Sequence, residues 1–289
     1  MQTEARKRLL AYRAARSPWT ADQEMTETSV DALRELRWNY QIPDSVELRL
    51  IKDGELPSSP PDGFITLYPA MLELGIRIPF QPFVHGWVSE LGIAPAQINP
   101  NGYRVIIALI ALWNDKFSCD PPVEVLRYHL RLKKNISVTK DPIEGFYCIV
   151  PQRPAIILEL PSAVRTWRNK WFYVKGWAFT SSGGVPAPNI VTHFKDAGKW
   201  RKLNSLSRVV KERFGTLLDL PREERLFKTI VIEEKLARLG IAAPARNMTL
   251  DKNDPGLRAR ILQQRQAIKR PIVPRPLVPP NEDKSSPKP

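Results

Sequence analysis

The sequence predicts an α+β fold: a helical first part of the core, then a small antiparallel sheet, then further helices and a disordered basic C-terminal tail. Apolar residues recur at helical spacing between residues 64 and 134, whereas short runs rich in β-branched and aromatic residues follow between 145 and 176. The chain closes on "KRPIVPRPLVPPNEDKSSPKP", a proline-rich composition that favours an extended and unpacked chain.

The N-terminal part of the chain is expected to be an arm followed by a linker. Residues 1–16 are predicted to form a short basic amphipathic helix, either a solvated terminal helix or a nucleic-acid or import patch around "RKR". Residues 17–63 are polar and end in the turn-rich "PSSPPDG". Within them Val30, Leu33 and Leu36 lie at helical spacing, so we expect this segment to pack on the core.

Two helices are expected at the start of the core. The first, "FITLYPAMLELG", runs to Gly75, and the second, "PFVHGWVSELG", has one apolar face with a period of four and ends at Gly92. Glycine is the residue that most often closes a helix, because it adopts the left-handed conformation without strain. Both segments are therefore predicted to end at their glycines.

Two more helices are expected to follow. Asn99 and Pro100 combine an N-cap with a first-turn proline, and the apolar residues after them surround the helix, which predicts a central, buried position. The next segment, "DPPVEVLRYHLRLKKN", begins at Asp120. Its last basic residues suit the negative end of a helix dipole.

Three short β-rich runs are expected to pair as antiparallel strands against these helices: "GFYCIV" at 145–150, "AIILEL" at 155–160 and "KWFYVKG" at 170–176. After the flexible connector "TSSGGVPAPN", the sequence predicts helices over about 201–214 and 221–240 and a basic helix over 255–269. The chain thus divides into a basic N-terminal arm and linker (1–55), a core (56–177), a linker (178–198), a helical extension (199–240), and a basic helix with a proline-rich tail (241–289).

The charge of the chain favours a polyanionic partner. Its 44 Lys and Arg exceed its 30 Asp and Glu, giving +14 and a pI near 9.9. From residue 241 onward ten basic residues face four acidic ones, an excess of +6, and residues 1–20 add five against one, or +4. Basic ends of this kind suit binding along phosphate backbones better than a sequence-reading cleft. The longest apolar run, 105–113, is shorter than the roughly 20 residues of a membrane helix, so a soluble protein without a membrane partner is expected.

Cysteine and histidine residues are too few and too far apart for a zinc knuckle or finger, and no metal or other cofactor is predicted. Cys119 and Cys148 are expected to be reduced, buried thiols, which indicates the nucleus or the cytoplasm. His85 and His129 lie on predicted helices and are expected to be structural, whereas His193 lies in a linker and is expected to be solvated.

No catalytic motif is found, so we predict a protein that is not an enzyme. The chain contains neither the DTG or DSG loop of aspartic proteases, nor the YxDD motif of polymerases, nor the phosphate-binding GxxxxGK[ST] motif. The glycine-rich "SSGG" at 181–184 lacks both a lysine and a following helix. An integrase would gather three carboxylates around divalent metal, and the predicted core offers no strand and helix pair that would place them.

The stretch "AVRTWRNKWFYVKG", residues 163–176, interleaves basic and aromatic side chains and is the strongest candidate for a nucleic-acid interface. Aromatic rings stack on bases and arginines pair with phosphates, which holds single strands without sequence preference. The alternative, favoured for the aromatic residues, is that they alternate across a strand and cover the helices while the basic residues of the preceding turn face solvent. The candidate nucleic-acid-binding residues are Arg165, Arg168, Lys170, Lys175 and Trp167.

A series of motifs follows a fixed order through the core. A glycine-to-proline step spans Gly75 to Pro79, a helix ends at Leu91–Gly92, and Pro95 to Asn101 leads into the long apolar helix. "VEVLRYHLRLKK" and "LPSAVRTWRNKWFYV" come next. In order and spacing these motifs, over residues 56–177, resemble the plant gypsy-type transposon domain, a gag-like family of retroelement-derived proteins.

The resemblance implies self-association and RNA packaging, although this chain lacks the Cys/His knuckle that many gag proteins carry. We therefore expect a non-enzymatic, retrotransposon-derived gag-like protein that forms homo-oligomers and binds RNA or DNA through charge. Two alternatives stay open. One is a protein-interaction scaffold without nucleic-acid binding, and the other is a catalytically inactive transposase or integrase relic.

Overall fold

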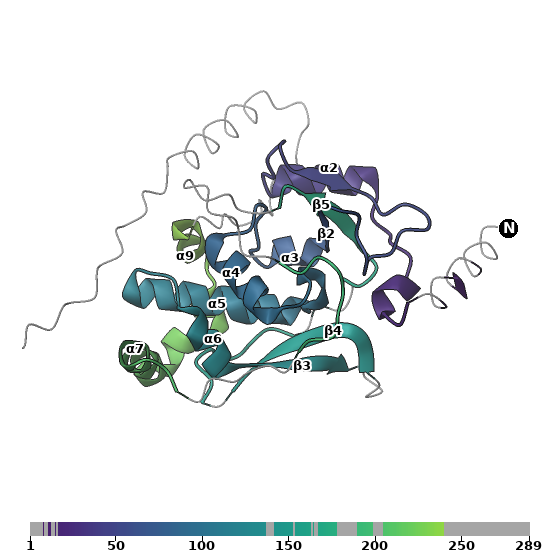
Figure 1. The fold of residues 1–289 in the computed structure, drawn as a ribbon. Helices are drawn as coiled ribbons and strands as arrows, with labels where there is room; N and C mark the ends of the chain where they lie inside the picture. Colours follow the sequence, from purple (N-terminus) through teal and green to yellow (C-terminus); the bar gives the residue numbers. More distant parts are fainter. Residues whose placement is uncertain are drawn as a thin grey trace, which may run out of the picture. The chain divides into compact units, whose positions relative to one another are not determined.

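The computed structural model describes residues 17–136, 142–152, 154–162, 164, 167–177, 190–198 and 205–239, together with residues 8, 11, 12 and 15 (Figure 1). The chain divides into two units, Met1–Ala245 and Arg246–Pro289, and all the described residues belong to the first. Their fold is α+β, as the sequence predicts. Most of the predicted N-terminal helix, the connector at 180–189, the basic helix over 255–269 and the proline-rich tail lie outside the described residues.

Helices and strands follow one another irregularly in the first unit. In chain order they are η1 (Thr20–Gln23), α2 (Val30–Asn39), β1 (Glu47–Arg49), β2 (Phe64–Leu67), α3 (Pro69–Glu73), α4 (Pro82–Leu91), η2 (Pro95–Gln97), α5 (Pro100–Phe117), α6 (Val123–His129), β3 (Leu130–Ile136), β4 (Pro142–Pro151), β5 (Phe172–Lys175), α7 (Arg208–Asp219), η3 (Arg222–Arg225), α8 (Phe227–Ile230) and α9 (Glu233–Arg238), where η marks a 3₁₀ helix. Among these helices, none has the length and apolar character that crossing a bilayer requires.

Two antiparallel sheets are present among the described residues. β5 is the central strand of the first, with β1 on one side and β2 on the other, so that Glu47 and Phe64 both lie opposite Lys175. β3 and β4 form a separate two-stranded ribbon. In Figure 1 the helices α3, α4 and α5 lie between the three-stranded sheet and this ribbon.

The central helix is α5, as its all-round apolar pattern predicts. The side chain of Asn99 caps it by accepting a hydrogen bond from the Gly102 amide at 2.9 Å, and Pro100 occupies the first turn. Every residue from 105 to 113 is buried. The helix packs so closely that a Cβ at position 102 would lie 2.7 Å from a methyl carbon of Ile98, so glycine is required there.

Two further helices also follow their predicted patterns. α4 ends at Gly92, which adopts the left-handed conformation (φ 63°) expected of a closing glycine. α2 is capped by Ser29, whose side chain accepts a hydrogen bond from the amide of Ala32, and it buries Leu33 and Leu36. Val30, the third apolar residue of the predicted stripe, stays 52 % exposed.

The helix predicted for "FITLYPAMLELG" is wrong in its first half. Phe64–Leu67 forms strand β2, which pairs with β5, and helix α3 begins only at Pro69. The reason is the proline, because the residue before a proline is pushed out of the helical region and into extended conformation. Tyr68 accordingly has φ −138° and ψ 149°. Proline itself suits the first helical turn, so the helix begins at Pro69 instead of running through it.

The helical end predicted for "RLKK" is also wrong. α6 ends at His129, and the chain continues directly into β3, where Leu130 pairs with Pro151 and Lys134 with Tyr147. The letters "LRLKK" alternate between apolar and basic, which is the period of a strand with one buried face. Pairing with β4 makes this segment a strand, so its basic residues lie along β3 instead of at the end of a helix.

The three predicted strands do not form one sheet. The run at 145–150 lies in β4 and pairs with β3, whereas the run at 170–176 lies in β5 and pairs with β1 and β2. The run at 155–160 forms no regular strand; its Leu158 amide donates to the carbonyl of Arg225 at 2.8 Å, and the Phe227 amide donates back to Leu158 at 2.9 Å. Its partner is thus the segment between η3 and α8, far away in sequence.

The C-terminal helices are shorter and later than predicted. α7 covers Arg208–Asp219 instead of about 201–214, and the single helix expected over 221–240 is divided into η3, α8 and α9. The division between α8 and α9 falls in "TIVI", residues 229–232. β-branched side chains lose rotamer freedom in a helix, and here they disfavour its continuation.

Candidate nucleic-acid interface

The aromatic residues of "AVRTWRNKWFYVKG" belong to the core. Trp171, Phe172, Tyr173 and Val174 are all 0 % exposed. β5 has a strand on each side and is covered on both faces, which explains an uninterrupted apolar run instead of an alternating one. The structural interpretation of these side chains is confirmed, and none of their rings is presented to a base.

Trp167 lies in an aromatic cluster that joins the two sheets. Its side chain is 5 % exposed, with ring centroids 4.6 Å from Tyr68 and 5.8 Å from Trp171. Phe146 of β4 stacks on Trp171 with centroids 5.8 Å apart and ring planes inclined by 4°. Stacking on a nucleic-acid base would require Trp167 to leave this cluster, so its position supports a structural role.

The basic residues of the stretch lie in two different places. Arg168 is half-buried beside Glu24: burial raises the pKa of the Glu24 carboxyl, and the Arg168 guanidinium lowers it in part. Lys170 is exposed in the same turn. Lys175 is exposed at the other end of β5, with its ammonium 5.7 Å from the ring centroid of Phe64. The structure therefore places Arg168 and Lys170 in one turn, whereas Lys175 lies apart from them at the far end of β5.

Arg165 lies outside the described residues. The turn that follows it is held by a neighbouring segment, because the Glu27 amide donates a hydrogen bond to the carbonyl of Asn169 at 2.7 Å. The described part of the candidate interface is thus a turn with one half-buried and one exposed cation. This is less charge than a phosphate-tracking groove presents.

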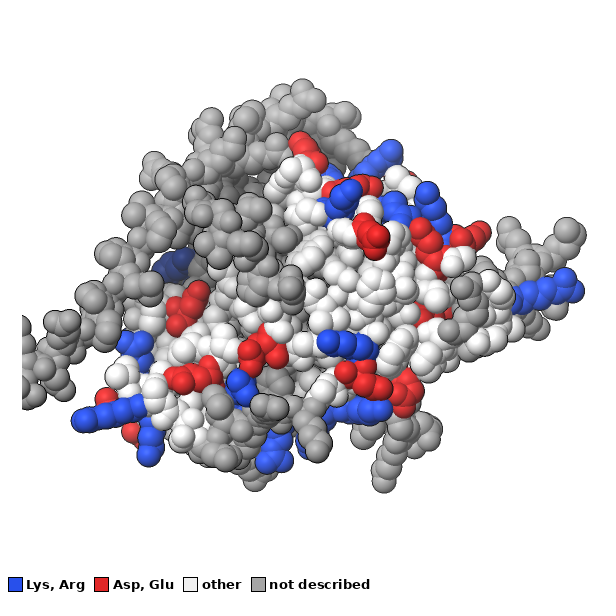
Figure 2. Space-filling model, in the orientation of Figure 1, with Lys and Arg blue, Asp and Glu red and all other residues white. Residues whose placement is uncertain are grey.

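The charge of the molecule is divided unevenly between the described residues and the rest of the chain. The described residues hold equal numbers of basic and acidic side chains, so the whole net charge of +14 belongs to segments outside them. On the face that Figure 2 shows, Lys and Arg lie interspersed with Asp and Glu instead of gathering by sign. The described residues taken together therefore carry no net positive charge that would attract a polyanion.

The histidines and cysteines lie largely as predicted. His85 and His129 are 3 % exposed, and burial lowers the pKa of both imidazoles, that of His129 to about 4. His193 is exposed. Cys119 and Cys148 are free thiols, half-buried rather than fully buried. Within the described ranges, no three His, Cys, Asp or Glu side chains gather as ligands for a metal ion.

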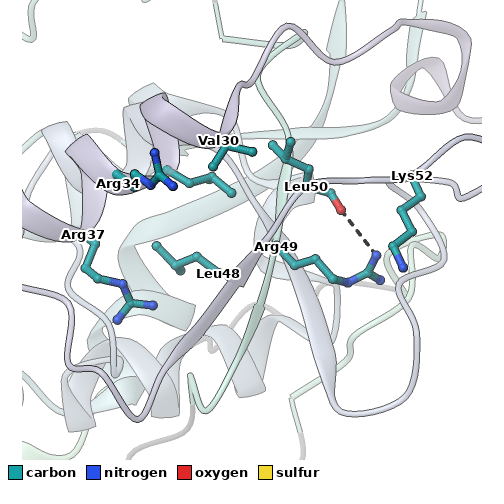
Figure 3. A pocket seen from close by; sticks show the side chains of 8 residues that line it. Val30, Arg34, Arg37, Leu48, Arg49, Leu50 and Lys52 are labelled. Atoms are coloured by element: carbon teal, nitrogen blue, oxygen red, sulfur yellow. Dashed lines mark hydrogen bonds between the residues drawn. The ribbon is translucent and has the colours of Figure 1, made fainter.

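A pocket of about 330 Å³ that was not predicted from the sequence lies between α2 and β1 (Figure 3). We call it the α2–β1 groove; its lining residues are Val30, Leu33, Arg34, Arg37, Leu48, Arg49, Leu50 and Lys52. Four of these recur on α2 at intervals of three and four, which is one face of a helix. That pattern was visible in the sequence, but the short strand that faces it was not.

Two of the three arginines that line the α2–β1 groove, Arg37 and Arg49, are held by their own neighbours. The Arg37 guanidinium donates to the carbonyls of Pro43 at 2.6 Å and Val46 at 2.5 Å. Arg49 donates two hydrogen bonds of 2.9 Å to the carboxylate of Glu55. Burial raises the pKa of Glu55, but the hydrogen bonds from Arg49 and the Lys52 amide, together with the charges of both residues, outweigh it and leave the pKa below its usual value. Both guanidinium groups are thereby fixed along the walls of the groove.

No family model matches the chain, and neither curated proteins nor solved structures show significant similarity to it. The resemblance of residues 56–177 to the gypsy-type transposon domain therefore stays an expectation that rests on the motifs themselves.

Proposed function

We propose that this chain is a non-enzymatic, gag-like protein whose folded unit self-associates and whose basic segments bind nucleic acid through charge. The division of charge supports the binding part, since the described residues are neutral and the net +14 lies outside them. Ten basic residues fall in 241–289 alone. The motifs of residues 56–177 that resemble a gag-like family support self-association.

Counterion release favours the segments with surplus charge. Each phosphate that a protein cation neutralises releases condensed counterions, and this drives sequence-independent binding. Several cations of the described unit already face carboxylates, among them Lys116, 2.5 Å from Glu224, and Lys235, 3.1 Å from Asp115. These two lysines are also largely buried (28 % and 18 % exposed), so pairing with a phosphate would release few counterions. Arg168, Lys170 and Lys175 are only three cations at two places on the fold, and we propose them as secondary contacts.

The first experiment measures fluorescence anisotropy of labelled single-stranded RNA and duplex DNA with the full chain across a salt series. With six or more phosphate contacts, affinity should fall by roughly 10³-fold or more between about 50 and 200 mM salt. A full-length variant in which the ten Lys and Arg of 241–289 become Gln should lose most of that slope. A control variant, Arg168→Gln with Lys170→Gln and Lys175→Gln, should keep it.

The salt dependence of the affinity could instead persist in the tail variant and be lost in the control variant. That result would assign the nucleic-acid interface to the folded unit. Salt-independent binding, or none at low salt, would contradict the proposal and favour the interaction scaffold. Strand cleavage abolished by a chelator would instead support a transposase or integrase relic. Sedimentation velocity of the same samples tests self-association.

We place the protein in the nucleus or cytoplasm, where Cys119 and Cys148 would stay reduced.

A further inference from the structure

We propose that the α2–β1 groove is a binding site for an extended peptide of a partner protein, in which an aliphatic residue is flanked by acidic ones. This site is separate from the charge-driven binding proposed above and does not depend on it. Its volume, about 330 Å³, is at the lower end of ligand pockets and suits about two side chains.

The arrangement of side chains in the groove points to this chemistry. Figure 3 shows Val30, Leu48 and Leu50 in the middle, with Arg34 and Arg37 on one side of them and Arg49 and Lys52 on the other. Of the described residues that line the groove, none is acidic. An occupant that is apolar at its centre and acidic toward its ends matches these walls in both polarity and charge.

Two of the cations are available to an incoming carboxylate. Among the described residues, Arg34 forms its salt bridge with Asp31, one turn away on the helix, and both side chains are largely exposed (76 % and 83 %). Exposed pairs of this kind contribute little and exchange readily. Lys52 is exposed; its ammonium contributes to lowering the pKa of the neighbouring Glu55 carboxyl, but within the described part of the chain it forms no salt bridge. These two cations flank the apolar centre.

Nucleic acid fits the groove less well than a peptide does. Asp31, Asp44, Glu47 and Glu55 surround it, so the region as a whole is not positive enough to follow a phosphate backbone. A nucleic acid also has no aliphatic side chain to cover the half-exposed Val30. The apolar side chains in the middle of the groove would stay in contact with water, so their burial would not contribute to binding.

The peptide is recognised by its side chains rather than by strand addition. β1 is an edge strand, but it is only three residues long. Arg37 donates to the carbonyl of Val46 just before it, and Arg49 donates to the carbonyl of Leu50 just after it, at 3.3 Å. Capped in this way, the edge cannot extend a ladder of backbone hydrogen bonds.

The test uses the full-length variant in which the ten Lys and Arg of 241–289 are Gln, because acidic peptides would otherwise adhere to the basic tail. This protein is used to select from a library of displayed random heptapeptides, and the affinities of the most enriched peptides are then measured by calorimetry. We expect the enriched sequences to share Leu, Ile or Val flanked by Asp or Glu.

Matched variants assign the binding to the groove. Val30→Asp places a carboxylate among the aliphatic side chains and Lys52→Glu reverses one flanking charge; each should weaken binding roughly tenfold or more, since a desolvated, unpaired or like charge is costly. Val209→Asp and Lys211→Glu on α7 are the controls. Val209 is as exposed as Val30 (58 % against 52 %), Lys211 is exposed like Lys52, and both controls should leave the affinity unchanged.

Three results would overturn the proposal. They are a selection without a common motif, an enriched motif that lacks the aliphatic or the acidic residues, and peptides that bind equally to the Val30→Asp and Lys52→Glu variants. Displacement of a bound peptide by single-stranded RNA would instead assign the groove to nucleic acid. Since the tail is neutralised throughout, none of these results bears on tail-driven binding.

Discussion

His129 is a buried imidazole at the junction of α6 and β3, and it makes the stability of the fold depend on pH. Its side chain is 3 % exposed, and its ring lies against that of Phe214 with centroids 5.1 Å apart. Burial lowers its pKa from 6.5 to about 4, because the charged ring loses its hydration in this apolar site. The native state therefore favours the neutral ring, whereas the unfolded chain takes up a proton at higher pH.

This difference in pKa predicts a loss of stability on acidification. As the pH falls from 6.5 to about 4, the unfolded state binds a proton that the native state does not, so the free energy of unfolding decreases. Below about pH 4 both states are protonated and this contribution levels off. His129 should account for a loss of roughly 3 kcal/mol at most. Urea unfolding at several pH values measures this loss in the free energy of unfolding. The His129→Gln variant should lack the part of the loss that comes from His129.

The comparison needs a control, because carboxylates titrate in part of the same window. His193→Gln is the matched control variant, because it removes an imidazole that is exposed in the fold instead of the buried one. If His129→Gln and the unaltered chain lose stability in parallel between about pH 6.5 and 4, the buried ring does not carry the effect.

Elements with local signals could be predicted from the sequence, and elements with distant partners could not. The cap of α5 at Asn99 and the closing glycine of α4 at Gly92 depend on neighbouring residues alone, and both are where the sequence indicates. β2 was taken for helix because its pairing partner, the segment at 172–175, lies more than 100 residues away. For such short segments, tertiary pairing outweighs intrinsic propensity.

Arg225 is the clearest case of a distant partner that fixes an element. Its guanidinium donates hydrogen bonds to the carbonyls of Ala155, Ile156 at 3.1 Å and Leu218 at 2.8 Å. It thereby ties the irregular segment at 155–160 to the end of α7 and to η3. Each of the three carbonyls is reached by a different nitrogen of the planar guanidinium, a spread that the single nitrogen of a lysine ammonium cannot reproduce.

Arg225→Lys should therefore destabilise the fold although it keeps the charge. Leaving two half-buried carbonyls without a charged donor should cost roughly 2 kcal/mol or more in the free energy of unfolding. Arg222→Lys is the matched control, since Arg222 pairs with Glu159 at the surface and such exposed pairs contribute about 0–1 kcal/mol. Guanidinium chloride unfolding measures both variants, and equal midpoints for the two would refute the role given to Arg225.

The uneven distribution of net charge along the chain could be predicted from the sequence, whereas the positions of the candidate site residues in the fold could not. Composition shows the basic excess and its concentration toward the ends, and the described residues are indeed neutral. It does not show that Trp167 faces a cluster of rings, or that Lys170 and Lys175 lie at opposite ends of β5. The α2–β1 groove needs both α2 and a strand that exists only because β5 pairs with it.

The N-terminal segment is part of the folded unit, although its composition resembles that of a linker. The carboxylate of Asp22 accepts hydrogen bonds from the amide of Ser58 at 2.9 Å and from its hydroxyl at 2.5 Å. The hydroxyl of Thr26 donates to the carbonyl of Trp171 at 2.9 Å. β1 then covers one edge of β5. A boundary at residue 55 would separate all of these partners.

Deletion of residues 1–55 should therefore prevent cooperative folding, even though the expected core of 56–177 remains. The deletion exposes the backbone of one edge of β5, leaves Ser58 without its carboxylate and uncovers the turn before β5, so aggregation through the free edge is expected. Deletion of residues 1–16 removes none of these contacts and should lower the thermal midpoint far less. Near-ultraviolet circular dichroism during heating distinguishes the two. If the chain that begins at residue 56 unfolds cooperatively at the same midpoint, the N-terminal segment is the linker that its composition suggests.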